Sequence, residues 1–184
     1  MRKKVVFGLI KIVLLSLLLV ACCKLPQPRL KTVDVLFVAY DRGESNAFIQ
    51  LEKQLRQKNI SYKVLAIGSA ADIFINHSES IKLPFFNLAE KLRHERSLYL
   101  PADIIASVIQ SYSPRIVYSG MASVAQAQLV NSFRRQGSYG IAFYDNFDNP
   151  LQQQYLLPFL KEIASLDELH VPTASARKGF LHLL

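Results

Sequence analysis

The stretch 33-VDVLFVAY-40 decides the fold class of this chain. It is a nearly continuous apolar run rich in β-branched and aromatic residues, and the turn Asp41-Arg42-Gly43 closes it. A run of this kind predicts a strand that is buried on both faces, as in parallel sheets. Residues 45–58 then place apolar side chains on one side of a helix, and 62-YKVLAI-67 predicts a second strand.

The rest of the chain continues this alternation of strands and helices. Further strands are predicted at 98–100 (an edge strand), 115–119, 139–144 and 168–171, and helices at 70–75, 84–94, 101–112, 121–135, 151–165 with a bend at Pro158, and from Ala174 onward. A polar loop is predicted at 76–80. The alternation predicts an α/β protein with a Rossmann-like open parallel sheet flanked by helices, as a single domain after a signal peptide.

The amino terminus has the features of an export signal. Three basic residues, 2-RKK-4, precede an apolar stretch that ends at 19-LVA-21, directly before Cys22. The Leu-x-Ala-Cys end resembles the bacterial lipoprotein signal, in which the peptide is cut before the cysteine and that cysteine is acylated. The resemblance implies lipidation of Cys22 and a lipid-anchored, extracytoplasmic location in the bacterial cell envelope. The alternative is an uncleaved anchor, but the stretch is short of about 20 residues and contains Lys11.

These features divide the chain into three parts. Residues 1–21 are predicted to be the lipoprotein signal peptide, residues 22–32 a lipidated tether that Pro26 and Pro28 keep extended, and residues 33–184 the Rossmann-like domain. The mature chain of about 160 residues suffices for one domain that buries about 70% of its unfolded surface. Since Cys23 would be the only other thiol, no internal disulfide is predicted.

Charge and motifs exclude several classes of function. The formal net charge of +8 falls to about +4 without the signal, and the basic residues are scattered, so nucleic acid is not an expected partner. No G-x-G-x-x-G follows the first strand, and neither a P-loop, a nucleophile elbow nor H-E-x-x-H occurs, so no cofactor is predicted. His77, His94, His170 and His182 lack the spacing of metal ligands, so no metal site is predicted.

The candidate site lies beyond the carboxyl ends of the predicted strands, where open parallel sheets bind ligands. Residues 41–45, 119–123 and 145–149 would form this rim, and the expected ligand is acidic or glycan-like, with a protein partner as an alternative. Three local explanations compete: Ser119 and Ser123 as helix caps, an Asp41–Arg42 ion pair, and turn chemistry at 148–150. The candidate ligand-binding residues are Asp41, Gly43, Ser45, Gly120, Ser123, Asp145 and Asn146.

Four segments, 35–60, 113–137, 140–150 and 166–181, carry a resemblance to a known family. They are similar to the N-terminal Rossmann-like half of GT-B-type glycosyltransferases and of UDP-N-acetylglucosamine 2-epimerase relatives. In that family a second, C-terminal domain mainly holds the nucleotide-sugar donor, and this sequence stops where that domain would begin. The resemblance therefore implies a non-catalytic binding or interaction module. The alternative is a glycosyltransferase-like or epimerase-like fragment that needs a missing donor-binding domain.

Overall fold

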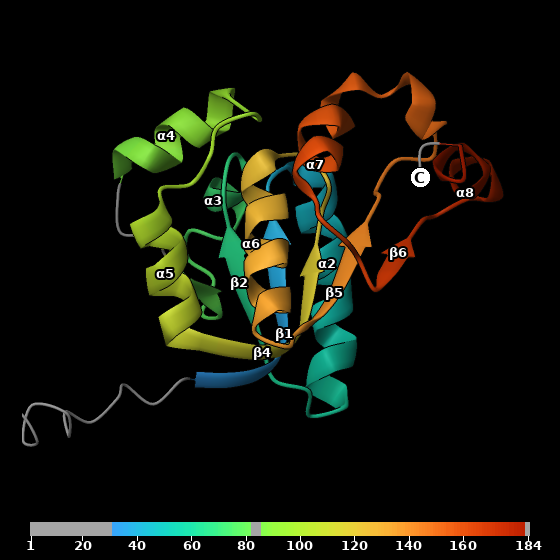
Figure 1. The fold of residues 1–184 in the computed structure, drawn as a ribbon. Coiled ribbons are helices and arrows are strands. Elements are labelled where there is room, and N and C mark those ends of the chain that lie inside the picture. Colours follow the sequence, from blue (N-terminus) through green and yellow to red (C-terminus); the bar gives the residue numbers. More distant parts are fainter. Residues whose placement is uncertain (1–30, 82–85, 183–184) are drawn as a thin grey trace, which may run out of the picture.

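A single sheet of six parallel strands forms the centre of the molecule (Figure 1). The computed structural model describes residues 31–81 and 86–182, so the predicted signal, the tether up to residue 30 and Cys22 lie outside the described residues. The strand order is β3-β2-β1-β4-β5-β6, which confirms the predicted Rossmann-like α/β class. The strands are β1 (Lys31–Ala39), β2 (Tyr62–Ala66), β3 (Ser80–Ile81), β4 (Tyr112–Ser119), β5 (Tyr139–Phe143) and β6 (Glu168–His170).

Helices pack on both faces of the sheet (Figure 1). One face is covered by α2 and α3, and the other by α5, α6 and α7. Within the described ranges, no helix is long and apolar enough to cross a membrane. The helices are α2 (Arg42–Gln57), α3 (Ala70–Ile73), α4 (Phe86–His94), α5 (Ala102–Ser111), α6 (Val124–Arg135), α7 (Leu157–Glu162) and α8 (Ala174–Phe180), with 3-10 turns at Pro150–Gln152 and Gln154–Leu156.

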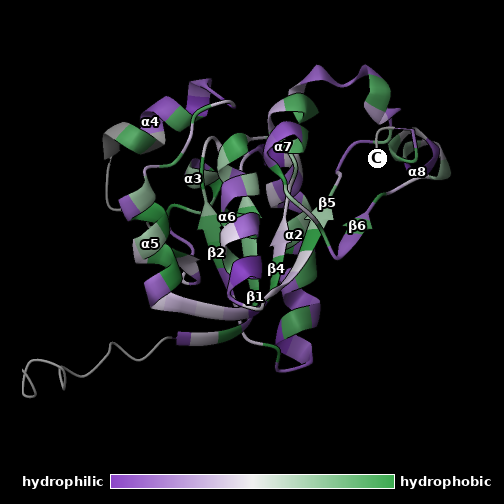
Figure 2. Cartoon of the chain, viewed as in Figure 1, coloured by the Kyte–Doolittle hydropathy of each residue, from purple (hydrophilic) through white to green (hydrophobic). Residues whose placement is uncertain are grey.

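Strand β1 is buried on both faces, as its sequence predicts. Phe37 points toward α2 and stacks on Phe48, with 4.6 Å between the ring centroids. Leu36 and Val38 point to the opposite face and belong to the cluster that includes Leu129 of α6. β1 and β2 are accordingly among the most hydrophobic parts of Figure 2. This central strand connects the two layers of the core.

The predicted helix beginning at Ser45 begins earlier, at Arg42. Asp41 is its N-cap, and its side chain accepts a hydrogen bond from the backbone N–H of Glu44. The predicted end of this helix is confirmed, because Asn59 adopts a left-handed conformation (φ 55°) and the Ile60 N–H bonds the Leu55 carbonyl. The early start brings Gly43 and Glu44 into the first helical turn.

The predicted edge strand at 98–100 is wrong. This segment is irregular, and the Leu100 N–H donates to the side chain of Gln128 on α6 at 2.7 Å rather than to the sheet. The edge strand that pairs with β2 is β3, at the end of the predicted polar loop. A strand of two residues is too short to show a periodic pattern, so it could not be predicted from the sequence.

The predicted helix at 151–165 is also corrected. It is divided into two 3-10 turns followed by α7, and Pro158 lies in the first turn of α7 instead of bending a continuous helix. Proline suits that position because the first N–H groups of a helix have no intrahelical acceptor. The strand predicted at 115–119 begins earlier, at Tyr112, so Pro114 lies within β4 opposite Val33, at a level that β5 does not reach.

Candidate functional site

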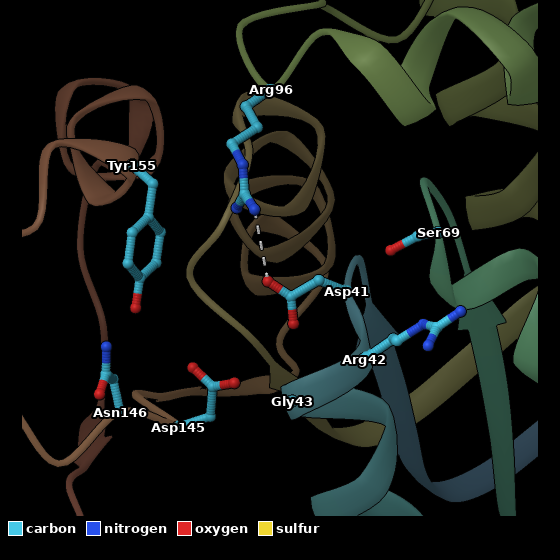
Figure 3. A pocket seen from close by; sticks show the side chains of 8 residues that line it. All are labelled: Asp41, Arg42, Gly43, Ser69, Arg96, Asp145, Asn146 and Tyr155. Atoms are coloured by element: carbon cyan, nitrogen blue, oxygen red, sulfur yellow. Dashed lines mark ion pairs between the residues drawn. The ribbon is translucent and has the colours of Figure 1, made fainter.

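Side chains from several segments meet at the carboxyl end of the sheet. The direction of the strand order reverses between β1 and β4, and in open parallel sheets a crevice forms at such a point. A pocket of about 500 Å³ lies at this end of the molecule (Figure 3). Eight residues line it: Asp41, Arg42 and Gly43 after β1, Ser69 after β2, Arg96 after α4, Asp145 and Asn146 after β5, and Tyr155 in the second 3-10 turn.

The structure brings four of the seven candidate ligand-binding residues to this pocket: Asp41, Gly43, Asp145 and Asn146. The other three are occupied within the fold. Ser45 is buried and its hydroxyl donates to the Asp41 carbonyl at 2.6 Å. Ser123 is the N-cap of α6, where its side chain accepts from the Gln126 N–H. Gly120 lies against the carboxyl group of Glu44.

Gly43 permits a close approach between α2 and the loop after β5. A Cβ atom at this position would lie 1.8 Å from an Oδ atom of Asp145. The Asp145 carboxyl therefore occupies the space of a missing side chain, at the first turn of α2. The same kind of contact recurs at Gly120, where a Cβ would lie 1.8 Å from the Glu44 carboxyl. Two glycines thus make room for two carboxyl groups near the pocket.

Glu44 is a buried acid directly behind the pocket. Its Oε2 accepts hydrogen bonds from the Tyr40 N–H at 2.7 Å and from Nε2 of Gln126 at 2.8 Å. Burial, followed by the negative charge of Asp41, raises the pKa of Glu44 to about 8, whereas these two hydrogen bonds oppose the rise. A carboxyl with this pKa is mostly protonated at neutral pH. Glu44 therefore adds little negative charge to the site there.

Asp145 is the second perturbed acid, and it lines the pocket itself. Burial and then the charge of Asp41 raise its pKa, while Arg96 acts in the opposite direction. Asp41 forms an ion pair with Arg96 at 3.6 Å. The side chain of Arg42 extends away from Asp41 in Figure 3. Asp41 therefore pairs with Arg96 and not, as suggested from the sequence, with Arg42.

Arg96 is the central cation of the site. Its guanidinium lies 5.2 Å from the ring centroids of both Tyr40 and Tyr155. One of its terminal nitrogens donates to the Ala122 carbonyl at 3.2 Å, and its own carbonyl accepts from the Val124 N–H at 2.9 Å. Arg96 therefore connects the segment after α4 with the start of α6 and with Asp41. Its position is fixed by groups on three sides.

Tyr155 supplies a phenol on the far side of the pocket (Figure 3). Burial and the negative charge of Asp145 raise its pKa, so the phenol stays protonated and can donate a hydrogen bond. Asp41 and Asp145 offer carboxylate acceptors, and Asn146 offers both an acceptor and a donor. The pocket thus combines acceptors, donors and an aromatic ring within one small volume.

The sequence placed Glu44 within the predicted rim segment 41–45 but did not single it out, and Arg96 and Tyr155 were missed. For Glu44 a signal existed: an N-cap residue followed three positions later by an acid, as in Asp41-x-x-Glu44, is the pattern of a helix start. This pattern would have predicted a helix start at Arg42 instead of Ser45, with Glu44 in the first turn after the strand. Arg96 and Tyr155 lie in irregular segments between helices, where no periodicity indicates which way a side chain points.

Metal binding has no support within residues 31–81 and 86–182, where no group of three or more His, Cys, Asp or Glu could hold an ion. His94 is exposed beside Glu90, and His170 lies between Glu168 and the hydroxyl of Tyr118. Both histidines therefore have local partners.

The strand order and the position of the crevice define this chain as a Rossmann-like α/β protein. No protein-family model, no curated protein and no solved structure matches it. Fold alone does not determine function, so the site must carry the functional argument.

Proposed function

We propose that this chain is a lipid-anchored protein of the bacterial cell envelope whose Rossmann-like domain binds a hydroxyl-rich, glycan-like ligand without transforming it. The observation that carries the ligand proposal is the pocket of about 500 Å³ lined by Asp41, Asp145, Asn146, Arg96 and Tyr155. Its volume is within the range of about 300–1,000 Å³ of small-molecule sites. Its location at the switch point is where such folds bind ligands.

The charges of the lining favour a neutral ligand over an acidic one. Asp41 and Asp145 both border the pocket. Of its two arginines, Arg96 is already paired with Asp41 at 3.6 Å and Arg42 extends away from Asp41 (Figure 3). An anion entering here would approach two carboxyl groups, whereas sugar hydroxyls would donate to them. The Tyr155 phenol can donate to a ring or glycosidic oxygen. Of the two expected ligand types, a glycan-like molecule is therefore the better fit.

We propose, from the sequence resemblance, that the domain corresponds to the acceptor-side half of a GT-B-type enzyme. In that family the nucleotide-sugar donor is held mainly by the other half, which supports a binding role for this domain. The competing function is an enzyme fragment completed by a separate donor-binding domain. The observation in its favour is that the pKa of Asp145, which lines the pocket, is raised, since a raised pKa shifts a carboxyl toward the protonated form that a general acid needs.

Ligand binding is tested with neutral and acidic sugars. Saturation-transfer NMR on the purified protein would compare N-acetylglucosamine and its short oligomers with glucuronic acid. We expect the wild-type protein to bind the neutral sugars. Asp145→Asn and Tyr155→Phe each remove one hydrogen bond to the ligand, so each should weaken binding about tenfold. Asp148→Asn should leave binding unchanged. Asp148 is an exposed residue of the same loop that does not line the pocket, so it is a matched control.

Two results would contradict this proposal. Preference for glucuronic acid would refute the charge argument, and neutral-sugar binding that Asp145→Asn and Tyr155→Phe leave intact would place the ligand elsewhere. Turnover of a nucleotide sugar by the purified chain would show that the protein is an enzyme. Absence of binding to every sugar would refute the glycan proposal.

The anchor is tested by metabolic labelling with radioactive palmitate. We expect label in the wild-type protein and in Cys23→Ser, and none in Cys22→Ser, because only Cys22 directly follows the small residue at the end of the apolar stretch. The Cys23→Ser variant is the matched control, since it removes the neighbouring thiol by the same substitution. Equal labelling of both variants would overturn the assignment.

A further inference from the structure

Basic side chains gather at the end of the sheet opposite the pocket. In a parallel sheet with crossover helices, strands begin and helices end on this side. Figure 2 shows hydrophilic colour at the lower end of α2 and at the start of β1. The exposed basic residues of this end, here called the basic base, are Lys31 at the start of β1, Arg56 and Lys58 at the end of α2, Arg115 in β4 and Arg135 at the end of α6.

A second pocket shows that these segments meet on one surface. It has a volume of about 540 Å³ and is lined by the start of β1 (Thr32–Asp34), the turn before β2 (Ser61), the start of β4 (113–115) and the turn after α6 (136–138). The segments that carry Lys31, Lys58, Arg115 and Arg135 are the same or immediately adjacent ones. Lys31, Lys58, Arg115 and Arg135 therefore share one face, and Arg56 precedes Lys58 by two residues at the end of α2.

The acidic side chains of this end have partners within the fold. Asp34 accepts from the Ser61 hydroxyl at 2.7 Å and the Ser61 N–H at 2.9 Å, which holds its pKa below the usual value. It also lies 3.4 Å from Arg115. Two others form ion pairs, Glu79 with Lys63 at 2.6 Å and Asp167 with Arg134 at 2.7 Å. Glu168, at the start of β6, accepts from the Tyr139 hydroxyl at 2.8 Å and lies 2.9 Å from Nε2 of His170. The surplus charge on the basic base is positive.

We propose that the basic base docks on anionic phospholipid headgroups of the membrane that carries the anchor. This inference rests on the proposed lipidation of Cys22. The chain enters the domain at this same end, because β1 begins at Lys31 (Figure 1). Residues 22–30 span at most about 30 Å when fully extended, so the lipid keeps the basic base close to the bilayer. Each Lys or Arg near an anionic surface strengthens its association about fivefold.

Docking in this way orients the ligand pocket. The pocket lies at the carboxyl ends of the strands, and β1, with nine residues, extends about 30 Å from base to rim. The pocket therefore opens away from the bilayer. Its ligand comes from the space or the cell-wall polymer beyond the membrane, and not from the lipid headgroups beneath the domain.

The test uses the lipidated full chain in vesicles, with lysine acetylation followed by mass spectrometry. Vesicles of phosphatidylcholine alone are compared with vesicles that also contain phosphatidylglycerol. We expect Lys31 and Lys58 to be modified several-fold more slowly in the anionic vesicles, with Lys91 on α4 and Lys178 on α8 unchanged at the opposite end. High salt should abolish the difference, because it screens exposed charges.

Charge reversal provides the second arm. We expect the protection of Lys31 to be lost in a triple variant of the basic base, Lys58→Glu, Arg115→Glu and Arg135→Glu. The control makes an equal charge change at the other end and should keep the protection; it combines Lys91→Glu, Arg177→Glu and Lys178→Glu. Equal acetylation of wild type in both vesicles, or protection that survives the basic-base reversal, would overturn the docking proposal. The wild-type comparison requires no variant to fold. Palmitate labelling and flotation with neutral vesicles report the anchor separately, so failure of docking and failure of anchoring are distinguishable.

Discussion

Glu44 is a residue whose charge state follows from its surroundings. It is 1% exposed, and the backbone N–H of Tyr40 and the side chain of Gln126 both donate to it. Two neighbouring acids, Asp41 and Asp145, disfavour a further negative charge. Protonation of Glu44 at neutral pH resolves this conflict. The site can therefore keep two pocket-lining carboxyl groups without placing a third charge beside them.

The raised pKa of Glu44 predicts how stability depends on pH. Its pKa rises from 4.5 to about 8 on folding, so the folded state retains a proton that the unfolded state releases. The stabilisation is fully present below about pH 4.5 and is lost as pH rises through about 8. Urea unfolding across this range should show a free energy of unfolding that falls by a few kcal/mol as pH rises.

Glu44→Gln should flatten this profile, because glutamine cannot ionise. At about pH 9 the variant should be more stable than the wild type, on the order of a few kcal/mol. Glu95→Gln, the same substitution at an exposed position, is the control and should retain the wild-type slope. A wild-type profile that is flat, or one that Glu44→Gln leaves unchanged, would show that Glu44 is not the titrating group.

At the scale of elements, helix α6 depends on the cap at its start. Ser123 is fully buried, and its hydroxyl accepts from the Gln126 N–H and donates to the Gln126 side chain at 3.2 Å. Gln126 in turn reaches Glu44 and the Val38 carbonyl. The cap thus belongs to a hydrogen-bonded chain that links α6 to the end of β1. Ser123 acts in the fold here and does not line the pocket.

Ser123→Ala should therefore destabilise the protein by about 1 kcal/mol, the usual cost of losing a helix cap. Chemical denaturation would measure this change. Ser111→Ala is a matched control, because the Ser111 hydroxyl donates to the Ser107 carbonyl within α5 and caps nothing. We expect that variant to change stability by less than about 0.5 kcal/mol. If Ser123→Ala proved as stable as Ser111→Ala, the Ser123 cap would not contribute to the stability of the protein.

The elements that could be predicted from sequence are those with strong local patterns. β1 and α2 show apolar runs and helical periodicity, and the Gly137 that ends α6 has the left-handed φ of 94° that favours glycine there. The pocket was predictable only in part. Asp41 and Asp145 follow apolar strands and could be placed at the rim, whereas Arg96 reaches it from an irregular segment. Its direction is set by Tyr40, Tyr155 and Asp41, which are tertiary contacts.

At the scale of the whole molecule, the core accounts for stability without covalent links. Three buried clusters lie on the two faces of the sheet and under α7 and α8, and residues 31–184 contain no cysteine. We expect a single cooperative thermal transition with the same midpoint in the presence and absence of reductant. Calorimetry would measure it. A gradual melt without a defined transition, or a midpoint that reductant lowers, would contradict a self-sufficient core.

The position of β1 in the middle of the sheet also governs how the chain folds. β1 is the first strand along the chain, yet one of its two neighbours, β4, follows only after β2 and β3; the contact between Asp34 and Arg115 spans 81 positions. Pairs this distant close large loops and slow the search for the native state. During synthesis, the apolar edge of β1 therefore stays unpaired, and it needs protection from self-association until Ser119 has emerged.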